Sequence, residues 1–454
     1  MAGGHGATHE SHIPDVIFGW DPMITAAVIL VISYTFIVSE KINRAVISLI
    51  GAGLMVGVGV LNQAAAIRGV DFNTLALLVG MMAIVGISRK TGMFQYVAIV
   101  TAKKVKGNPR ALMAALAVVT AVLSALLDNV TTVMLIIPIT LLLCEQLKIP
   151  AFPMLFTQIL ASNIGGTATL IGDPPNILIG SAVGLSFMDF VYNVGPPAAI
   201  CMVVILVVQD VMWGRKLTAS KAAREKIMKY DTSAAITDHV LMYKSLAVMA
   251  FALFGFVVGH GQGFEPGSVA LFSAAILMLL DGLGGTPEEQ SHKVHDTLTK
   301  VEWETIFFFI GLFIIVYGVE STGLLELLAQ KFLAFTEGDI RLTGILIIWS
   351  SAIISAIVDN IPFVATMIPL IESMGPGLGG DEALLPLWWS LSLGACLGGN
   401  GSLVGASANL IVAGLAERAG QRISFLKFLK YGFPLMILTI IIASIYAWFF
   451  ILPA

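Results

Sequence analysis

Long apolar stretches recur along the whole sequence, and they restrict the possible folds more than any other feature. A helix needs about 20 apolar residues to cross the hydrocarbon core of a bilayer. Of the 454 residues, 57% are hydrophobic and only 12% are charged, whereas a soluble domain is about 25% charged. The sequence therefore predicts an all-α polytopic membrane protein. The main apolar windows lie at 22–39, 44–62, 73–88, 194–213, 243–259, 268–281, 303–319 and 432–452.

The two halves of the chain contain matching segments in the same order. Such regular spacing indicates an internal repeat. The matched segments are 71–92 with 302–323, and 165–176 with 398–409, at offsets of 231 and 233. The first offset also relates Ser124, Asp128, Asn129 and Pro138 to Ser355, Asp359, Asn360 and Pro369.

Charges in equivalent loops indicate that the repeat is inverted. Residues 89–110 carry six basic side chains and no acid, whereas their equivalents at 320–341 carry four acids and two basic residues. The next pair reverses this, because 182–193 has one acid and 415–430 has four basic residues. Short cytoplasmic loops are rich in Lys and Arg, so equivalent loops are expected on opposite sides of the membrane. The acid-rich segment 282–302 does not support this assignment.

This pattern predicts four parts of the chain and a multi-pass topology in the cell inner membrane. Residues 1–21 form a polar tail, expected outside, and the basic segment 214–242 forms a cytoplasmic linker. Its basic residues bind anionic lipid or simply obey the positive-inside rule. The first repeat covers 22–213, with a re-entrant hairpin at 111–147 and a broken helix at 151–187. The second repeat covers 243–454, with a hairpin at 343–371 and a broken helix at 386–414.

Polar residues at the four interruptions form the candidate site. Transporters with inverted repeats bind their substrates near the bilayer midplane, between discontinuous helices. A charge there costs at least about 2.5 kcal/mol, so Asp128 and Asp359 either cap half-helices or bind a proton or a cation such as Na⁺. Asp173 is a third candidate, although its mirror position is Ala406. The candidate binding residues are Asp128, Asn129, Thr131, Thr132, Asn163, Thr167, Thr169, Asp173, Asn176, Asp359, Asn360, Asn400, Ser402 and Asn409.

Several other kinds of site and function are disfavoured. The three cysteines, Cys144, Cys201 and Cys396, have no CxxC spacing, which argues against a zinc site or a disulfide framework. His5, His9 and His12 lie in the polar tail and bind metal or remain solvated. No intramembrane nucleophile–base pair or metal-ligand set is present, so no enzyme is expected. A net charge of −4 does not suggest nucleic acid, and a passive channel with polar half-helices remains the main alternative.

Four segments carry a resemblance to a known group of proteins. They are LLDNVTTVMLIIPI, NIGGTATLIGDPPN, DNIPFVATMIPL and LGACLGGNGSLVGASANLIVAGLAE. The sequence resembles the ion transporter superfamily, and within it the arsenical-pump group (ArsB/NhaD, including the melanosomal P protein), over about residues 25–450.

This resemblance implies a homodimer whose scaffold helices form the interface while a transport domain moves as an elevator. It also implies secondary transport coupled to protons or Na⁺, without another cofactor. Arsenite or antimonite efflux, which confers arsenical resistance, is the expected activity, with an ATPase subunit as a further partner. The alternative is Na⁺/H⁺ antiport. Dicarboxylate relatives carry Ser-Asn-Thr at the tips, whereas this chain has Asp-Asn-Val and Asp-Asn-Ile, so transport of an organic anion is less favoured.

Overall fold

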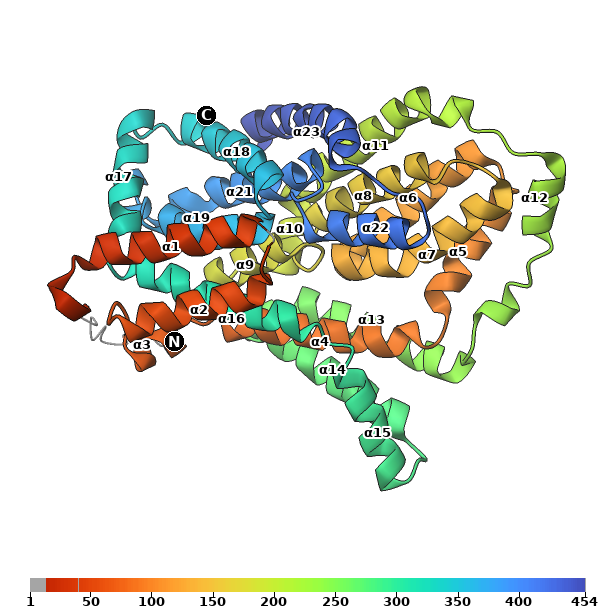
Figure 1. The fold of residues 1–454 in the computed structure, drawn as a ribbon, viewed down its shortest axis with the longest axis horizontal. Coiled ribbons are helices and arrows are strands. Elements are labelled where there is room, and N and C mark those ends of the chain that lie inside the picture. The colour runs from red at the N-terminus through yellow and green to blue at the C-terminus, as the bar shows by residue number, and fades with distance from the viewer. Residues whose placement is uncertain (1–13, 40, 454) are drawn as a thin grey trace. The chain divides into compact units, whose positions relative to one another are not determined.

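The computed structural model describes residues 14–39 and 41–453. The histidines of the expected N-terminal tail lie outside these residues. Within the described residues the chain is helical and contains no strand (Figure 1). The helices are α1 (Pro22–Ser39), α2 (Arg44–Gly57), α3 (Gln63–Arg68), α4 (Phe72–Arg89), α5 (Met93–Lys104), α6 (Pro109–Leu126), α7 (Asn129–Leu147), α8 (Ala151–Thr167), α9 (Pro174–Val183), α10 (Phe187–Asn193), α11 (Gly195–Met212), α12 (Lys221–Met228), α13 (His239–Val258), α14 (Pro266–Gly282), α15 (Pro287–Leu298), α16 (Trp303–Glu320), α17 (Leu324–Thr336), α18 (Ile340–Ile357), α19 (Asn360–Glu372), α20 (Gly375–Leu378), α21 (Leu385–Gly398), α22 (Ser407–Arg418) and α23 (Phe425–Tyr446).

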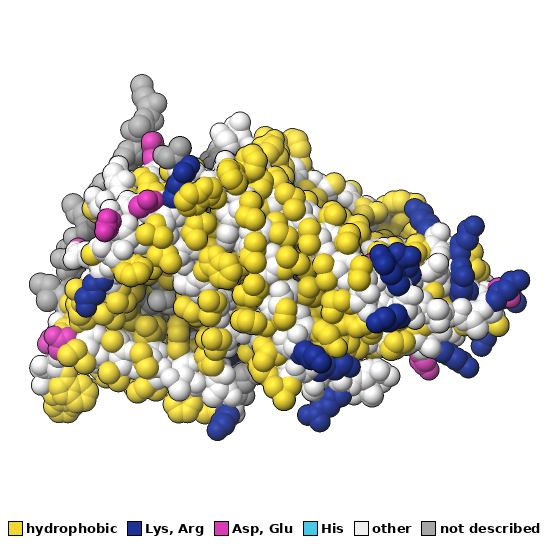
Figure 2. Space-filling model, turned by 90° about the horizontal axis from the view of Figure 1, so that it is seen from above, with side chains coloured by type: hydrophobic (Ala, Val, Ile, Leu, Met, Phe, Trp, Pro, Cys, Tyr) yellow, Lys and Arg dark blue, Asp and Glu magenta, His cyan; other side chains and the backbone are white. Residues whose placement is uncertain are grey.

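The predicted membrane character is confirmed. In the described part of the chain, nine helices are long and apolar enough to cross a bilayer. Figure 2 shows a broadly apolar face on which Lys and Arg side chains gather towards the end where Figure 1 places α12. An apolar surface of this kind is solvated by lipid rather than by water.

The chain divides into two compact units that cut across the repeats. The first unit contains the chain up to Asp71 together with Trp303–Phe332, and the second contains Phe72–Glu302 and the chain from Leu333 onwards. Each unit therefore takes helices from both repeats. All hairpin and break residues belong to the second unit.

Equivalent glycines make equivalent helix crossings, which supports the repeat at the level of packing. In the second unit, a Cβ on Gly80 of α4 would lie 2.6 Å from the carbonyl carbon of Ala270 in α14. In the first unit, a Cβ on Gly311 of α16 would lie 2.5 Å from the carbonyl carbon of Ser48 in α2. Small residues allow such close approach of helices in membranes. The α4–α14 and α16–α2 crossings are thus the same contact built twice.

The same holds where each broken helix crosses its hairpin. A Cβ on Gly165 of α8 would lie 2.6 Å from the Cα of Ala121 in α6. A Cβ on Gly398 of α21 would lie at the same distance from the Cα of Ala352 in α18. These four positions keep the two sequence offsets, so the repeated sequence folds into repeated structure.

Five segments that the sequence analysis treated as loops contain whole helices. They are α5 in 89–110, α10 in 182–193, α17 in 320–341, α12 in the linker and α15 in 282–302. The α5 helix has 12 residues and ends on Lys103 and Lys104, which complement the negative end of its dipole. Short helices with charged ends cannot be told from loops by their hydropathy.

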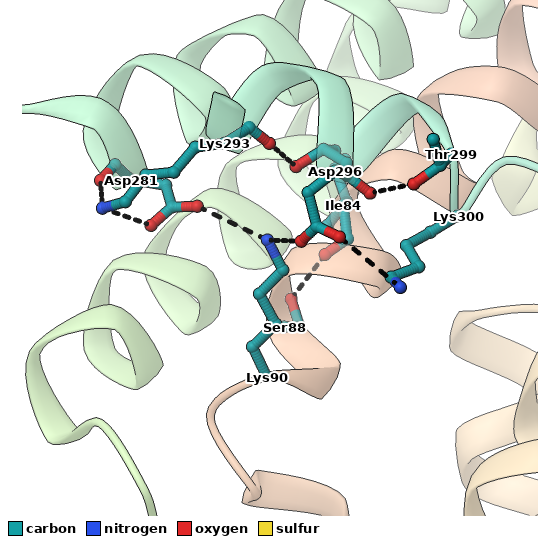
Figure 3. Close-up of polar contacts among 9 residues, drawn as sticks. Ile84, Ser88, Lys90, Asp281, Lys293, Asp296, Thr299 and Lys300 are labelled. Atoms are coloured by element: carbon teal, nitrogen blue, oxygen red, sulfur yellow. Dashed lines mark hydrogen bonds and ion pairs between the residues drawn. The ribbon is translucent and has the colours of Figure 1, made fainter. Parts of the chain in front are cut away.

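One acid of segment 282–302, Asp296, and Asp281 just before the segment are paired with lysines (Figure 3). Asp296 lies 2.7 Å from the Nζ of Lys90, which follows α4, and 3.5 Å from that of Lys300. Asp281 of α14 lies 3.4 Å from Lys293 and 3.9 Å from Lys90. The hydrogen bond and charge of Lys90 hold the pKa of Asp296 below its ordinary value. This ion network ties α15 to α4 and α14.

The helix interruptions lie close to their predicted positions. In the first repeat α6 and α7 are separated by Leu127 and Asp128, and α8 and α9 by residues 168–173. In the second repeat α18 and α19 are separated by Val358 and Asp359, and α21 and α22 by residues 399–406. The α9–α10 pair adds a bend of 117° that the sequence analysis did not predict.

Candidate functional site

Both tip carboxylates cap the helix that follows them. Asp128 Oδ1 accepts a 2.7 Å hydrogen bond from the Thr131 N–H, at the start of α7. Asp359 Oδ1 accepts a 3.1 Å bond from the Ile361 N–H, and its Oδ2 accepts a 2.6 Å bond from the Ser407 hydroxyl. Bonds of this kind satisfy free N–H groups in the first turn of a helix. The capping interpretation of these two acids therefore has direct geometric support.

Asp173 differs from the tip acids because its side chain does not cap a helix. It occupies the N-cap position of α9 without a capping bond. Its Oδ1 accepts a 3.4 Å hydrogen bond from the amide of Asn360, and its buried Oδ2 has no partner among the described residues. The carboxylates of Asp359 and Asp128 lie close enough to interact with that of Asp173 by electrostatic repulsion. Of the three acids, this one has a buried oxygen left free to bind something else.

Two asparagines hold the unwound backbone of the breaks in matching ways. Asn176 donates to the carbonyls of Thr167 (3.1 Å) and Thr169 (2.9 Å). Asn409 donates to the carbonyls of Gly399 and Ser402, both at 2.8 Å. Carbonyls in a helix break need such partners because lipid provides none. These two predicted site residues therefore support the breaks.

Two serines that the sequence analysis did not place in the site join each hairpin to its broken helix. Ser124 donates a 2.6 Å bond to the carbonyl of Ser162, and Ser355 donates a 2.8 Å bond to the carbonyl of Ala395. Both pairs keep the repeat offsets. The matching serines at 124 and 355 were visible in the sequence, and that match was the available clue to their shared role.

Asn163 lies at the centre of the site and connects the two repeats. Its side-chain NH₂ donates to Asn400 and to Asn409, both at 3.0 Å, and its carbonyl accepts a 3.3 Å bond from Asn129. The four side chains come from α7, from α8 and from the break and first turn of α22. All four are at least 98% buried. One amide therefore joins the first hairpin to the second broken helix.

The four hydrogen-bonded asparagines, called the amide chain below, are Asn129, Asn163, Asn400 and Asn409. Their hydrogen-bond partners determine which way each side-chain amide faces. Backbone carbonyls only accept, so Asn409 must turn its NH₂ towards Gly399 and Ser402 and its carbonyl towards Asn163. Asn163 must then donate to Asn409 and Asn400, and its own carbonyl is left for Asn129. The ends that remain free are the Asn129 carbonyl and the Asn400 NH₂.

The centre of the site presents unpaired polar atoms of two kinds. Among the site residues, the buried oxygens without a partner in the described structure are Asn129 Oδ1, Asp173 Oδ2 and the hydroxyl Thr132 Oγ1, which can donate as well as accept. The buried site nitrogen without a partner is Asn400 Nδ2. Asn129 and Thr132 share one face of α7, and the Asn129 N–H bonds the carbonyl of Gly172, next to Asp173. Because buried polar groups are nearly always paired, this cluster indicates a place for a polar solute.

Three other predicted residues lie outside this cluster. The Thr167 and Thr169 hydroxyls bond the carbonyls of Asn163 and Ala125, and Ser402 Oγ accepts from the Val404 N–H. These hydroxyls therefore shape the backbone. The sequence analysis did not include Ser392 and Cys396, which lie 2.6 Å and 3.5 Å from Asn176 Oδ1.

Thr131 faces an open cavity beside the first hairpin. This cavity of about 600 Å³ reaches from Thr131 to the basic ends of α4 and α15, with Arg89, Lys90 and Lys300 in its wall. A second cavity of about 470 Å³ shares Arg89 and Met134 with it and extends to Arg418 of α22. The pair forms a basic approach to the start of α7. No cluster of metal ligands occurs in the part of the chain that is described.

Comparison with known proteins identifies the family. The pattern of the CitMHS family, described as citrate transporter, matches residues 34–394. An uncharacterised transporter of Mycobacterium bovis is 40% identical over 94% of this chain and 98% of its own length. The human P protein is 31% identical over 93% of this chain and 59% of its own length.

Solved structures share the fold at low sequence identity. The YdaH transporter of Alcanivorax borkumensis, described as having an unusual topology, aligns with a TM-score of 0.63 at 12% identity over 95% of this chain and 98% of its own. MtrF of Neisseria gonorrhoeae, from a class of antimetabolite efflux pumps, aligns with a TM-score of 0.58 at 10% identity over 96% of each chain. The expected resemblance to P protein is confirmed, whereas the narrower resemblance to the ArsB/NhaD group does not follow from these matches. The chain is a multi-pass secondary transporter that belongs to the CitMHS family.

Proposed function

We propose that this transporter exports a small, uncharged, hydroxylated solute in exchange for protons, with arsenite or antimonite as the specific candidates. The observation that carries the proposal is the pattern of unpaired atoms at the centre of the site. Asn129, Thr132 and Asp173 each have a buried oxygen without a partner there, the Thr132 hydroxyl can also donate, and Asn400 adds an unpaired NH₂. At neutral pH arsenite is mostly the trihydroxide, whose O–H groups donate and whose oxygens accept.

Charge supports an uncharged cargo. The hairpin tips and breaks contain Asp128, Asp173 and Asp359 but no Lys or Arg. Citrate, after which the family is described, carries several negative charges at neutral pH. It would meet these carboxylates without a cationic side chain, so it would need bound cations to enter. Transport of free citrate is therefore not the proposed activity.

Na⁺/H⁺ antiport is the second candidate, and the set of acceptors favours it. Asn129, Thr132 and Asp173 offer an amide, a hydroxyl and a carboxylate oxygen, and Na⁺ binds oxygen ligands of this kind. The Asn400 NH₂ argues against a bare cation, since it would have to face a water ligand. This donor separates the two candidates.

The proposed mechanism is an elevator within a homodimer in the cell inner membrane. The location of every hairpin and break in one compact unit supports a transport domain that carries the whole site. The scaffold would include the first unit and form the dimer interface. The basic linker would face the cytoplasm, where an ATPase subunit of an arsenical pump would be a further partner.

The test is flux into proteoliposomes under an imposed pH gradient, with arsenite, Na⁺ and citrate offered in separate experiments. Arsenite accumulation that requires the pH gradient supports the proposal. Proton movement that requires Na⁺, without arsenite flux, establishes the antiporter instead. Citrate accumulation without a divalent cation contradicts the charge argument.

A matched pair of variants tests the site itself. Thr132→Val keeps the shape of the side chain but removes one unpaired acceptor, and Thr101→Val removes a hydroxyl that bonds the Val97 carbonyl within α5. A lost hydrogen bond to a bound solute costs about 1 kcal/mol. Thr132→Val should therefore weaken apparent arsenite affinity by about fivefold, whereas Thr101→Val should not change it. Equal effects of the two variants would place the cargo elsewhere.

A further inference from the structure

The two pseudo-equivalent half-sites have different chemistry. Of the unpaired polar atoms at the centre of the site, Asn129 Oδ1, the Thr132 hydroxyl and Asp173 Oδ2 belong to the first repeat, and Asn400 Nδ2 belongs to the second. At the mirror positions of Thr132 and Asp173 the second repeat has Phe363 and Ala406. Neither side chain has a polar atom. The acceptor cluster is therefore built once in each chain.

The second repeat also satisfies its own tip acid more completely. Ser407 stands where the first repeat has Pro174, and its hydroxyl bonds Asp359 Oδ2 while the Ile361 N–H bonds Oδ1. Both oxygens of Asp359 are thus engaged in holding α19 and α22. In the first repeat Pro174 has no hydroxyl to offer, and Asp128 is held by the start of its own helix.

Among the described residues, no positive side chain is recorded beside Asp173 that would neutralise its carboxylate. The titratable side chains that reach it are Asp128 from the first hairpin, Asp359 from the second and the thiol of Cys396 from α21. Its other polar neighbour, Asn360, is neutral. A buried carboxylate is strongly disfavoured unless it is paired. A proton or another cation at Asp173 Oδ2 would satisfy both the charge and the unpaired oxygen.

We propose that each chain has a single coupling site, formed by the first repeat around Asp173, and that Asp128 and Asp359 hold their hairpins without exchanging protons. This inference rests on the proton coupling in the proposed function and specifies where and how often a proton binds. With an uncharged cargo, one proton crosses the membrane in each cycle. At zero membrane potential, a tenfold proton gradient then balances a tenfold cargo gradient.

The first test counts titrating carboxyl groups and requires no cargo. Infrared difference spectra of the wild-type protein in lipid would follow buried carboxylic C=O stretching bands between pH values of about 5 and 9, a range that covers strongly displaced carboxyl groups. One titrating band is expected, and it should be absent from Asp173→Asn. Persistence of the band in Asp173→Asn would overturn the proposal.

The double variant Asp128→Asn with Asp359→Asn provides an independent check if Asp173→Asn does not fold. It retains Asp173, so the same single band should remain with unchanged intensity. If that band disappears or loses intensity in the double variant, a tip acid binds a proton and the proposal is overturned.

The second test measures coupling in proteoliposomes with arsenite as the probe. The reversal potential of the wild type should correspond to one proton for each arsenite, and Asp173→Asn should exchange arsenite across the membrane without pH-driven accumulation. A ratio of two protons, or accumulation by Asp173→Asn, contradicts the single site. Failure of the wild type to move arsenite would refute the proposed cargo, while the infrared result would still decide the number of proton sites.

Discussion

Removal of the Asn163 side chain should destabilise the protein far more than removal of its repeat equivalent. Asn163 and Cys396 occupy the same place in the two broken helices, at the offset of 233. Asn163 makes three side-chain bonds across the centre of the site. Cys396 makes one weak hydrogen bond of 3.5 Å, to Asn176 Oδ1, and its thiol also lies beside Asp173. The pair Asn163→Ala and Cys396→Ala therefore compares a position with three amide bonds to one with a weakly bonded thiol.

The size of the effect follows from the groups left without partners. In Asn163→Ala, one amide donor on Asn129 and the side-chain carbonyls of Asn400 and Asn409 lose their bonds. Hydrogen bonds between membrane helices contribute about 0.6 kcal/mol each, and those in protein interiors about 1 kcal/mol each. Three bonds then amount to about 2–3 kcal/mol. A thiol is a weak donor, so Cys396→Ala should cost less than about 1 kcal/mol.

Equilibrium unfolding in mixed detergent micelles would measure the free energy of unfolding for both variants. A third variant, Asn163→Asp, keeps the shape but replaces the NH₂ donor by an oxygen that faces two side-chain carbonyls. It should be at least as destabilising as Asn163→Ala. If Asn163→Ala and Cys396→Ala lose the same free energy, the amide chain does not hold the repeats together and the argument for its orientation fails.

Three further predictions follow from features outside the amide chain. Gly80→Leu and Gly311→Leu should each destabilise the protein by about 1–3 kcal/mol, because a side chain would meet backbone at both helix crossings. Thermal unfolding measures this, with Gly53→Leu as the control, since a Cβ there meets nothing within 4 Å. A similar loss of stability in Gly53→Leu would contradict the packing argument. Thr131→Cys should react with a membrane-impermeant maleimide from the side that carries the basic cavity wall, because Thr131 lines that open cavity. The native cysteines are buried and should give little background labelling. Labelling only from the opposite side would reverse the assigned topology. The pKa of Asp296 is lower in the folded protein than the value of about 3.9 in an unfolded chain. Its ion pair therefore stabilises the fold fully above pH of about 3.9, and this stabilisation is lost as the pH falls through the folded-state pKa. Asp296→Asn should therefore cost at most about 1 kcal/mol at neutral pH and nothing in strong acid, and a cost that grows on acidification would reverse the sign of this linkage.

The repeat and its interruptions could be predicted because they leave local marks in the sequence. Glycines interrupt α8 and α21 at corresponding places, and an aspartate stands at each hairpin break because a capping carboxylate suits the first turn of α7 or α19. The serines at 124 and 355 keep the offset because they make the same bond. Matching segments within one chain therefore carried information about packing as well as topology.

The division of labour among the acids could not be predicted. Which acid keeps an unpaired oxygen depends on whether a hydroxyl such as that of Ser407 lies within hydrogen-bonding distance of a carboxylate oxygen. Sequence does not give distances to that precision. Two of the three partners of Asn163 lie 237 and 246 residues away, in a repeat where the equivalent residue is a cysteine. Sequence symmetry therefore pointed to Asp128 and Asp359, whereas the unpaired oxygen belongs to Asp173.

The fixed orientation of the amide chain has a consequence for the alternating states of a transporter. Each amide in the chain must face the same way as its predecessor, so reversal of one reverses all of them. The orientation is inherited from the carbonyls of Gly399 and Ser402, which are available only while the second break stays unwound. If that backbone rewinds into helix, Asn409 is released, and the site can exchange its free carbonyl on Asn129 for a free NH₂. The backbone of the second repeat would then decide whether the cargo meets a hydrogen-bond acceptor or a donor on Asn129 of the first repeat.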